Sequence, residues 1–382
     1  MIADRVRMAA YERAIGDVVR PGDVVVEIGT GTGVLACLAV RAGARRVYAI
    51  EKTDVIEIAR SLATANGFAE RITFIYGASE RASLPEQADV LIGETLGHFG
   101  IEEQILSLYA DAGARFLRAG GRIVPEALTL YLGPVESPDA YDGIRFWEER
   151  PLGLDWSPAV LAAQNTPRYL RFPASALLGD PKVMADLDLR KVRAGDCSGQ
   201  VDCEIHRAGS LHGMAGWFRA RLSPGVELGN GPTDPETHWE QVFFPIRQPL
   251  AVLPQDRVRC RIMGGPAPGG FAGGMLWTWE MTVLRGGVER LSSRQNSLDG
   301  QIMAPEHFAL MLAHRAEGLQ PQGQALLRAL SLMAGGISLA DLGESLRKEF
   351  PGLYPTGEAV RAAAAGFAAR HANRSGADRS PL

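Results

Sequence analysis

The stretch Val24-Val25-Val26-Glu27-Ile28, followed at once by Gly29-Thr30-Gly31-Thr32-Gly33, decides how the first part of this chain folds. Its apolar run predicts a buried strand, and the residues from Val34 onward predict a helix directly after the glycine turn. Glycine lets the turn approach a ligand closely, and the start of a helix leaves backbone N–H groups free beside it. The next strand-like run ends at Glu51, whose carboxylate can accept both hydroxyls of a ribose. We therefore expect a nucleoside-binding site that includes Gly29, Gly31, Gly33 and Glu51.

The spacing of the glycines indicates which nucleoside binds. A dinucleotide site has the pattern Gly-x-Gly-x-x-Gly, and a phosphate-binding P-loop ends in a lysine. Here the third glycine, Gly33, comes one residue earlier, and no lysine follows it. The pattern from Glu27 to Gly33 resembles the first motif of the seven-strand S-adenosylmethionine methyltransferases, whose cofactor has no phosphate. A methyl donor is favoured over a nicotinamide or ATP. The alternative is a glycine-rich turn that binds no ligand.

The composition is that of an ordinary globular protein. Of the 382 residues, 46% are hydrophobic and 22% are charged, enough for two or three domains. The net charge of −4 gives no general attraction to nucleic acid or to an anionic membrane, and no apolar run approaches the roughly 20 residues of a membrane span. The N-terminus lacks the apolar core of a secretion signal, and the four cysteines have no paired C-x-x-C spacing. We expect reduced thiols, no metal site and a cytoplasmic protein.

Residues 1–124 alternate between strand-like and helical patterns. This alternation predicts an α/β domain in which helices cover both faces of a parallel sheet. Pro125 marks the expected domain boundary. The predicted strands span residues 24–28, 46–50, 72–76 and 88–93, and the predicted helices span residues 34–42, 53–66 and 102–118.

Residues 125–303 have a pattern with a period of two. Residues 257–262 alternate arginine with Val, Cys and Ile, and an aromatic row alternates over residues 275–283. Such a pattern predicts an antiparallel sheet or barrel with one solvated face. Within this region, residues 147–186 are less regular and are expected to form an inserted arm.

The C-terminal part returns to a helical pattern over residues 304–372, and residues 373–382 are polar and expected to be disordered. Ser338 and Thr356 are predicted to cap two of the helices. Basic and acidic residues nearly balance in this part, which argues against a DNA-binding helix-turn-helix.

An acidic hairpin follows the fourth predicted strand. Residues 93–103 have the sequence Gly-Glu-Thr-Leu-Gly-His-Phe-Gly-Ile-Glu-Glu, and a loop there lies beyond the carboxyl ends of the strands, where open α/β sheets bind ligands. Glu94 and Glu103 could converge on one cation. A guanidinium fits them because its fork offers paired N–H donors to each carboxylate. The alternative is that Glu102 and Glu103 only favour the start of a helix. We expect Glu102 to face solvent.

Together these motifs resemble the protein arginine methyltransferase family over roughly residues 1–300. The hairpin is similar to that family's double-glutamate loop, with Glu94 and Glu103 at its two positions. Further similarities are the D-x-x-R-x-x-x-Y pattern from Asp4 to Tyr11, the pair Ser79-Glu80, residues 211–218 and the T-H-W loop at residues 237–239.

The resemblance implies a Rossmann-like, seven-strand methyltransferase domain (residues 1–124) followed by an antiparallel β-barrel domain (residues 125–303). A small helical domain, faintly similar to winged-helix domains that bind peptide leaders, would follow. A packing appendage or a dimer contact is the alternative for that last domain. The arm at residues 147–186 would join two copies into a homodimer.

The resemblance also implies S-adenosylmethionine as the cofactor, with Arg7 on its carboxylate and Glu80 on its adenine amino group. Glu94 and Glu103 would hold the arginine guanidinium of a protein or peptide while a nitrogen attacks the methyl group. His238 paired with Asp4 would carry away the proton. The alternative for His238 is that it only braces the interface between the domains.

Two departures from the family pattern lie in the acceptor region. Thr95-Leu96 stands where the family usually has Trp-Met, and His98 stands where a tyrosine is common. A reshaped pocket keeps a second interpretation open, in which the same scaffold methylates a small natural product. The degree and symmetry of arginine methylation do not follow from the sequence.

Overall fold

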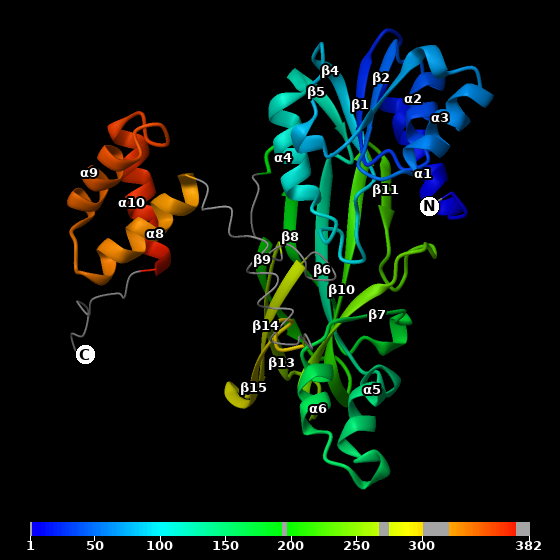
Figure 1. The fold of residues 1–382 in the computed structure, drawn as a ribbon. Helices are drawn as coiled ribbons and strands as arrows, with labels where there is room; N and C mark the ends of the chain where they lie inside the picture. The colour runs from blue at the N-terminus through cyan, green and yellow to red at the C-terminus, as the bar shows by residue number, and fades with distance from the viewer. Residues whose placement is uncertain (1, 193–196, 267–274, 301–320, 372–382) are drawn as a thin grey trace. The chain divides into compact units, whose positions relative to one another are not determined.

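The structure is a computed structural model that describes residues 2–192, 197–266, 275–300 and 321–371. It divides into two compact units, Met1–Ile302 and Met303–Leu382, which are described separately. In the first unit, an α/β layer at one end is continuous with a long antiparallel β-region, and a pair of helices projects from the far end of that region (Figure 1).

The first sheet consists of five parallel strands in the order β3-β2-β1-β4-β5. β1, the predicted strand of Val and Ile, lies in the middle with every residue buried. The strands are β1 (Val24–Ile28), β2 (Arg46–Glu51), β3 (Ile72–Tyr76), β4 (Ala88–Gly93) and β5 (Leu117–Val124). The helices of this layer are α1 (Arg5–Val18), α2 (Val34–Arg41), α3 (Ile56–Ala65) and α4 (Ile105–Arg115).

The expected count of seven strands in this layer is wrong. After β5 the chain turns at Pro125 into β6 (Ala127–Val135), which pairs with β10 and β8 of the antiparallel region instead of adding to the first sheet. Helix α4 is also shorter than the predicted 102–118, because residues 117–124 satisfy their backbone groups as a strand beside β4.

The register of the first sheet determines where a ligand can bind. Ile28 at the end of β1 pairs with Ile50 on one side and with Gly93 on the other. The loops that follow β1, β2 and β4 therefore begin next to one another. β1 connects onward to β2 while β4 lies on its other side, which makes this the switch point where open α/β sheets bind ligands.

Two antiparallel sheets form the barrel-like second region. One has the order β7-β12-β10-β6-β8 with β11 beside β10, and the other has the order β15-β14-β13-β9. The period-two prediction is confirmed in β13, where Val258, Cys260 and Ile262 are buried and the arginines between them are exposed. The strands are β7 (Arg168–Leu170), β8 (Lys182–Asp188), β9 (Cys197–Glu204), β10 (Gly209–Ser223), β11 (Val226–Gly229), β12 (Gln241–Val252), β13 (Arg257–Pro266), β14 (Met275–Arg285) and β15 (Val288–Asn296).

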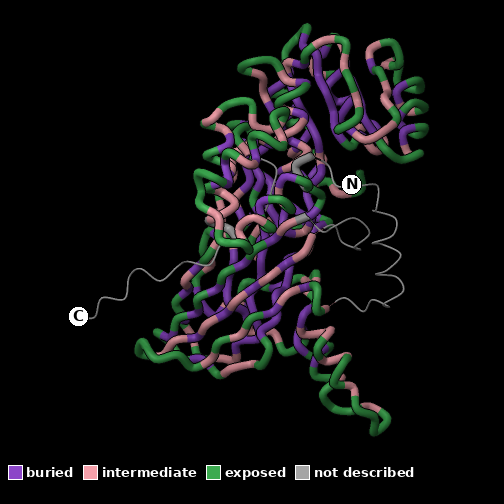
Figure 2. Tube along the Cα trace, turned by 60° about the vertical axis from the view of Figure 1, so that its left-hand side comes forward, coloured by how far each residue is buried: buried purple, intermediate pink, exposed green. Residues whose placement is uncertain are grey.

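The projecting arm is a pair of helices, α5 (Pro138–Glu148) and α6 (Ser157–Gln164). It starts earlier and ends earlier than the predicted 147–186, because β7 pairs with β12 and β8 pairs with β6 in the barrel sheet. Much of the arm is exposed (Figure 2), and Leu152 at its tip is 91% exposed.

The second unit contains α8 (Pro321–Ala334), α9 (Leu339–Glu349) and α10 (Gly357–His371). The predicted caps are confirmed: Ser338 accepts a hydrogen bond from the Asp341 backbone N–H, and Thr356 accepts one from Ala359. The faint winged-helix likeness stays a prediction, and the tail 373–382 lies outside the described residues. None of the described helices is long and apolar enough to cross a membrane.

One carboxyl group lies inside the first sheet. Glu27 on β1 is only 1% exposed and accepts a hydrogen bond from the Thr30 hydroxyl. Burial raises its pKa from an ordinary 4.5 to about 8.

This burial predicts a pH-dependent stability. Between about pH 4.5 and pH 8 the folded protein keeps a proton on Glu27 that the unfolded chain has released, so the free energy of unfolding falls as pH rises through this window. Glu27→Gln keeps a hydrogen-bond acceptor but cannot ionise. In thermal unfolding monitored by circular dichroism, the midpoint should fall less for this variant than for wild type between about pH 6 and about pH 9. The exposed Glu57→Gln is the control and should follow wild type. Equal slopes for Glu27→Gln and wild type would contradict the assignment.

Candidate active site

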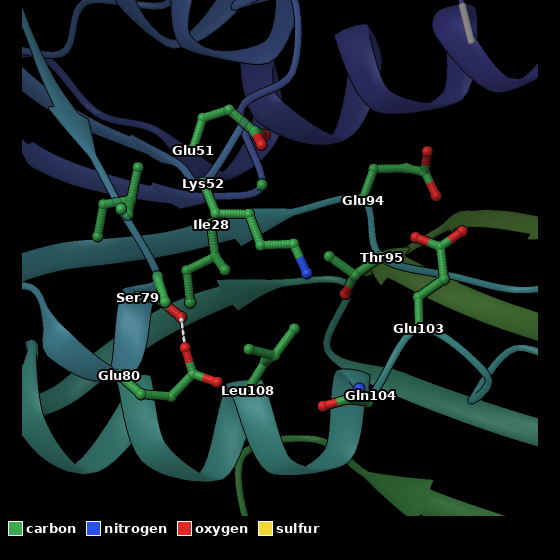
Figure 3. A pocket seen from close by; sticks show the side chains of 14 residues that line it. Ile28, Glu51, Lys52, Ser79, Glu80, Glu94, Thr95, Glu103, Gln104 and Leu108 are labelled. Carbon is green, nitrogen blue, oxygen red and sulfur yellow. Dashed lines mark hydrogen bonds between the residues drawn. The ribbon is translucent and has the colours of Figure 1, made fainter. Parts of the chain in front are cut away.

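A cavity of about 480 Å³ lies where the loops after β1, β2 and β4 meet (Figure 3). A volume of a few hundred Å³ is typical of small-molecule sites. Glu51 borders one side of the cavity, Ser79 and Glu80 lie at one end, and Glu94 and Glu103 lie at the other. The lining residues are Ile28, Gly29, Ile50, Glu51, Lys52, Gly77, Ala78, Ser79, Glu80, Glu94, Thr95, Glu103, Gln104 and Leu108.

Glu51 is held in a fixed orientation at the end of β2. One of its carboxylate oxygens accepts the Gly31 backbone N–H at 3.0 Å. The other accepts the backbone N–H and the hydroxyl of Thr53 at 2.9 and 2.8 Å. Three of the roughly four acceptor sites of this carboxylate are therefore occupied. One ribose hydroxyl can bind the remaining site, and a second can bind by displacing the Thr53 hydroxyl.

The three glycines of the turn serve different needs. All have a positive φ, which other residues rarely adopt. Gly29 lines the cavity directly, and Gly31 donates its N–H to Glu51. At Gly33 a Cβ would lie 2.8 Å from Ala59 Cβ, so this glycine is required for the packing of α3 against the turn. Only Gly29 of the three touches the cavity.

The opposite wall is the short turn Ser79–Arg81. The Ser79 hydroxyl donates to the Glu80 carboxylate at 3.2 Å (Figure 3), and the Arg115 guanidinium of α4 donates to the Ser79 carbonyl. Glu80 therefore lies on the side of the cavity away from the acidic hairpin, where the resemblance places an adenine amino group.

Glu94 and Glu103 approach one another at the acidic end of the cavity (Figure 3). Burial raises the pKa of Glu94, an effect opposed by the Arg7 guanidinium. Burial also raises the pKa of Glu103, and the negative charge of Glu94 raises it further. A bound cation would offset both the burial of Glu94 and the unfavourable effect of its charge on Glu103.

Arg7 lies beside this pair but does not line the cavity. Its Nη1 donates to the Glu94 carboxylate at 2.9 Å, and its guanidinium lies 4.3 Å from the centre of the Trp239 ring. The buried Arg7 Nε makes no hydrogen bond within the described residues, but it lies 3.5 Å from Asp4 Oδ2 in an ion pair. The predicted role of Arg7 on a cofactor carboxylate stays a prediction.

Asp4 and His238 meet through the backbone. Asp4 caps α1 by accepting the Arg7 N–H at 3.0 Å, and its second oxygen accepts the His238 backbone N–H at 2.8 Å. The resemblance pairs these two residues, and the structure brings them together, but the contact is made by the backbone N–H of His238 and not by its imidazole. His238 itself is exposed.

Glu102 differs from the expectation that it faces solvent. It is 8% exposed, and its two oxygens accept the backbone N–H groups of Phe99 and Ile101 at 2.7 and 3.1 Å. The tight turn of the hairpin leaves these N–H groups without a backbone acceptor, and the carboxylate satisfies both. Its neighbour Glu103 is accessible to solvent at the rim of the cavity, where its carboxylate is partly desolvated, and it is turned toward the cavity.

Sequence reasoning did not identify Lys52 and Gln104 as part of the site. Lys52 extends into the cavity (Figure 3), where its positive charge lowers the pKa of Glu103. Both residues directly follow a predicted site glutamate in the chain, and this adjacency could have identified them as candidate site residues.

The residues fit S-adenosylmethionine. Glu51 can accept a hydrogen bond from the ribose, and Glu80 can accept one from an amino group. Ile50, Ala78 and Leu108 offer apolar contacts for a purine.

Comparison with known families gives two matches. Residues 126–268 match a family described as "Arginine methyltransferase oligomerization subdomain", and residues 9–124 match one described as "Ribosomal protein L11 methyltransferase (PrmA)". The chain is 30% identical to protein arginine N-methyltransferase 1 of Schizosaccharomyces pombe over 278 residues, 70% of this chain and 82% of that protein. It is 28% identical to the probable protein arginine N-methyltransferase 6 of Arabidopsis thaliana over 305 residues, 68% of this chain and 70% of that protein.

Solved structures share the fold. A Trypanosoma brucei PRMT1 enzyme–prozyme heterotetrameric complex with AdoHcy has a TM-score of 0.71 at 21% identity, covering 78% of this chain and 96% of that one. Protein arginine methyltransferase 10 of Arabidopsis thaliana, in an open conformation, has a TM-score of 0.68 at 24% identity with the same coverage.

Removal of the Glu51 carboxylate should weaken cofactor binding. Glu51→Ala deletes the acceptor for both ribose hydroxyls, and the loss of hydrogen bonds to a charged group costs about 1–3 kcal/mol. Isothermal titration calorimetry with S-adenosylhomocysteine should show a corresponding rise in Kd. Thr53→Val is the control, because it removes one loop hydrogen bond and keeps the carboxylate. Unchanged affinity in Glu51→Ala, or an equal loss in Thr53→Val, would contradict the ribose assignment.

Proposed function

This chain belongs to the protein arginine N-methyltransferase family, and on that premise we propose that Glu94 and Glu103 clamp the guanidinium of its arginine substrate. The enzyme is an S-adenosylmethionine-dependent methyltransferase that acts on arginine. The observation that supports the clamp is the convergence of two carboxylates with raised pKa values at one end of the cavity. A guanidinium offers paired N–H donors to each of them and relieves their repulsion.

The clamp also explains how a weak nucleophile can react. S-Adenosylmethionine, when bound, supplies an electrophilic methyl group on a sulfonium sulfur. Glu94 and Glu103 would draw the positive charge of the guanidinium toward two of its nitrogens and leave the third oriented for attack. Positioning of this kind can supply on the order of 7–11 kcal/mol of barrier reduction in favourable cases.

The attacking nitrogen loses a proton as its new bond to carbon forms. We propose that His238 passes this proton to solvent, since its exposed side chain carries ring nitrogens that can bind and release a proton. Asp4 would then fix the position of His238 through the backbone N–H and not through the ring.

The acceptor is proposed to be an arginine in a protein or peptide. A small-molecule guanidine is the competing acceptor. Mass spectrometry after incubation with S-adenosylmethionine distinguishes them: arginine-containing peptides should gain the mass of one or more methyl groups, whereas modification confined to small guanidines would exclude the peptide assignment.

A homodimer is proposed from the exposed apolar residues of the arm. Phe146, Leu152, Leu154 and Leu161 are each about half exposed or more. Clustered apolar side chains on a projecting element mark an interaction surface, and two-fold dimers are the commonest oligomers. The match of residues 126–268 to an oligomerization subdomain supports this.

Removal of either clamp charge should abolish most turnover. Glu103→Gln keeps the shape of the side chain but leaves the bound cation half paired, a loss of about 3–5 kcal/mol, or roughly 10²- to 10⁴-fold in rate. Glu94→Gln should lose as much, although it also deprives Arg7 of its partner. Methylation of an arginine peptide measures the rate, and calorimetry should show cofactor affinity within about twofold of wild type for Glu103→Gln.

The control for this pair is Glu86→Gln, a partly exposed glutamate outside the cavity that pairs with Arg45. It should keep the wild-type rate. Normal turnover in both Glu94→Gln and Glu103→Gln would exclude a guanidinium clamp.

Substitution of the arm tip should separate the dimer. Leu152→Ser combined with Leu154→Ser removes two exposed apolar side chains without touching β7, whose pairing with β12 a larger deletion would destroy. Light scattering at about micromolar concentration should then report a monomer where wild type reports a dimer. Val288→Ser, an exposed apolar residue on β15, is the matched control and should stay dimeric. A monomeric wild-type protein would refute the proposal.

A further inference from the structure

The turn of the acidic hairpin is closed by a carboxylate instead of by backbone hydrogen bonds alone. Glu102 Oε1 accepts the Phe99 N–H at 2.7 Å, and Oε2 accepts the Ile101 N–H at 3.1 Å. The Gly100 N–H completes the turn by donating to the Gly97 carbonyl at 3.0 Å. The Glu102 side chain therefore folds back into the turn formed by the residues just before it in the chain.

Gly97 leaves the space that this carboxylate occupies. A Cβ at position 97 would lie 2.7 Å from Glu102 Cβ and would overlap one of the carboxylate oxygens. Because no real Cβ approaches that closely, a side chain at position 97 and the observed position of Glu102 exclude each other.

The orientation of Glu103 depends on this closed turn. Glu102 and Glu103 are consecutive, so with Glu102 held inward, Glu103 points out toward Glu94 across the cavity (Figure 3). We propose that Glu102 is a positioning residue for arginine methylation, which holds the hairpin so that Glu103 faces Glu94 at the guanidinium site. This inference rests on the proposed clamp and assigns no contact between Glu102 and the substrate.

A carboxylate suits this position better than an amide. Both of its oxygens accept, and each faces a different N–H group. In Glu102→Gln one of the two N–H groups must face the amide NH₂ and loses its partner. An unsatisfied buried N–H destabilises the turn even though the side chain keeps its size.

Protonation should disturb the turn in the same way. Burial, with a smaller contribution from the charge of Glu103 beside it, raises the pKa of Glu102 to about 7. Tyr169 of β7 is the other ionisable neighbour, and it stacks on His98, whose pKa burial lowers. As pH falls through about 7, one oxygen of Glu102 becomes a hydroxyl. This oxygen then accepts a hydrogen bond from its backbone N–H less well than a carboxylate oxygen does.

The test compares Glu102→Gln, Gly97→Ala and the double variant in the full chain. A displacement of about 1 Å at a reacting group can cost about 100-fold in rate, so kcat on an arginine peptide should fall by that order in each single variant. The Kd for S-adenosylhomocysteine should stay within about twofold of wild type, and amide exchange at Phe99 and Ile101 should accelerate. Because both substitutions act on one contact, the double variant should be no slower than the slower single variant.

The pH profile separates positioning from a general loss of stability. Wild-type kcat should decline below about pH 7, and Glu102→Gln should lack that limb. Asp256→Asn is the matched control, because Asp256 is a buried carboxylate that accepts the Leu253 N–H in a turn away from the cavity. It should lower the melting temperature and leave kcat unchanged.

Two results would overturn the inference: a wild-type kcat in Glu102→Gln, or unchanged amide exchange at Phe99 and Ile101 in that variant. Failure of the proposed function is distinct from both, because it would appear as wild-type protein that methylates no arginine peptide. In that case the exchange measurement still decides whether Glu102 closes the turn.

Discussion

The burial of Phe99 is the contact on which the site depends. Phe99 belongs to the hairpin that leaves the first sheet, but its ring is fully buried against Phe244 of β12 and Trp277 of β14, at 5.8 and 5.6 Å between ring centres. Loss of such a buried ring typically costs about 3–5 kcal/mol. The Leu96 carbonyl adds a second attachment by accepting the Trp239 indole N–H at 3.0 Å. The acidic hairpin is thereby fixed at the joint between the α/β layer and the antiparallel region.

An ion pair also fixes the N-terminal segment, which contains Arg7, at the same joint. The ion pair between Arg7 and Glu94 is almost fully buried, and removing both charges from water costs about as much as their attraction returns. Its main consequence is therefore position, not stability. The start of α1 lies against the hairpin through Arg7 and against the loop before β12 through Asp4 and His238. Segments from the N-terminus and from the barrel thereby hold the hairpin, while the residues that line the cavity all come from the α/β layer.

Much of the first sheet could be predicted, because its strands are short apolar runs whose signal is local. β1, β3 and β4 begin and end at the predicted residues. Features set by distant partners could not be predicted in this way. The five-strand count depends on β6 pairing with β10, and the bounds of the arm depend on β7 and β8 pairing with strands far along the chain. Within the site, the glutamates and glycines were identified from motifs, but the role of Gly33 in packing against Ala59 follows only from the placement of α3.

Glu102 and Glu103 show most clearly that residue type alone does not predict the role of a side chain in the site. They are adjacent and chemically identical, and a helix-start preference would apply equally to both. They differ in the direction of their side chains: Glu102 points into the turn, and Glu103 points toward the cavity. The inward carboxylate satisfies two backbone N–H groups that the tight turn leaves unpaired, and the outward one is left without such partners near Glu94. A hairpin that must place one carboxylate accurately therefore uses the other to hold its own backbone, and only the pattern of backbone hydrogen bonds distinguishes the two.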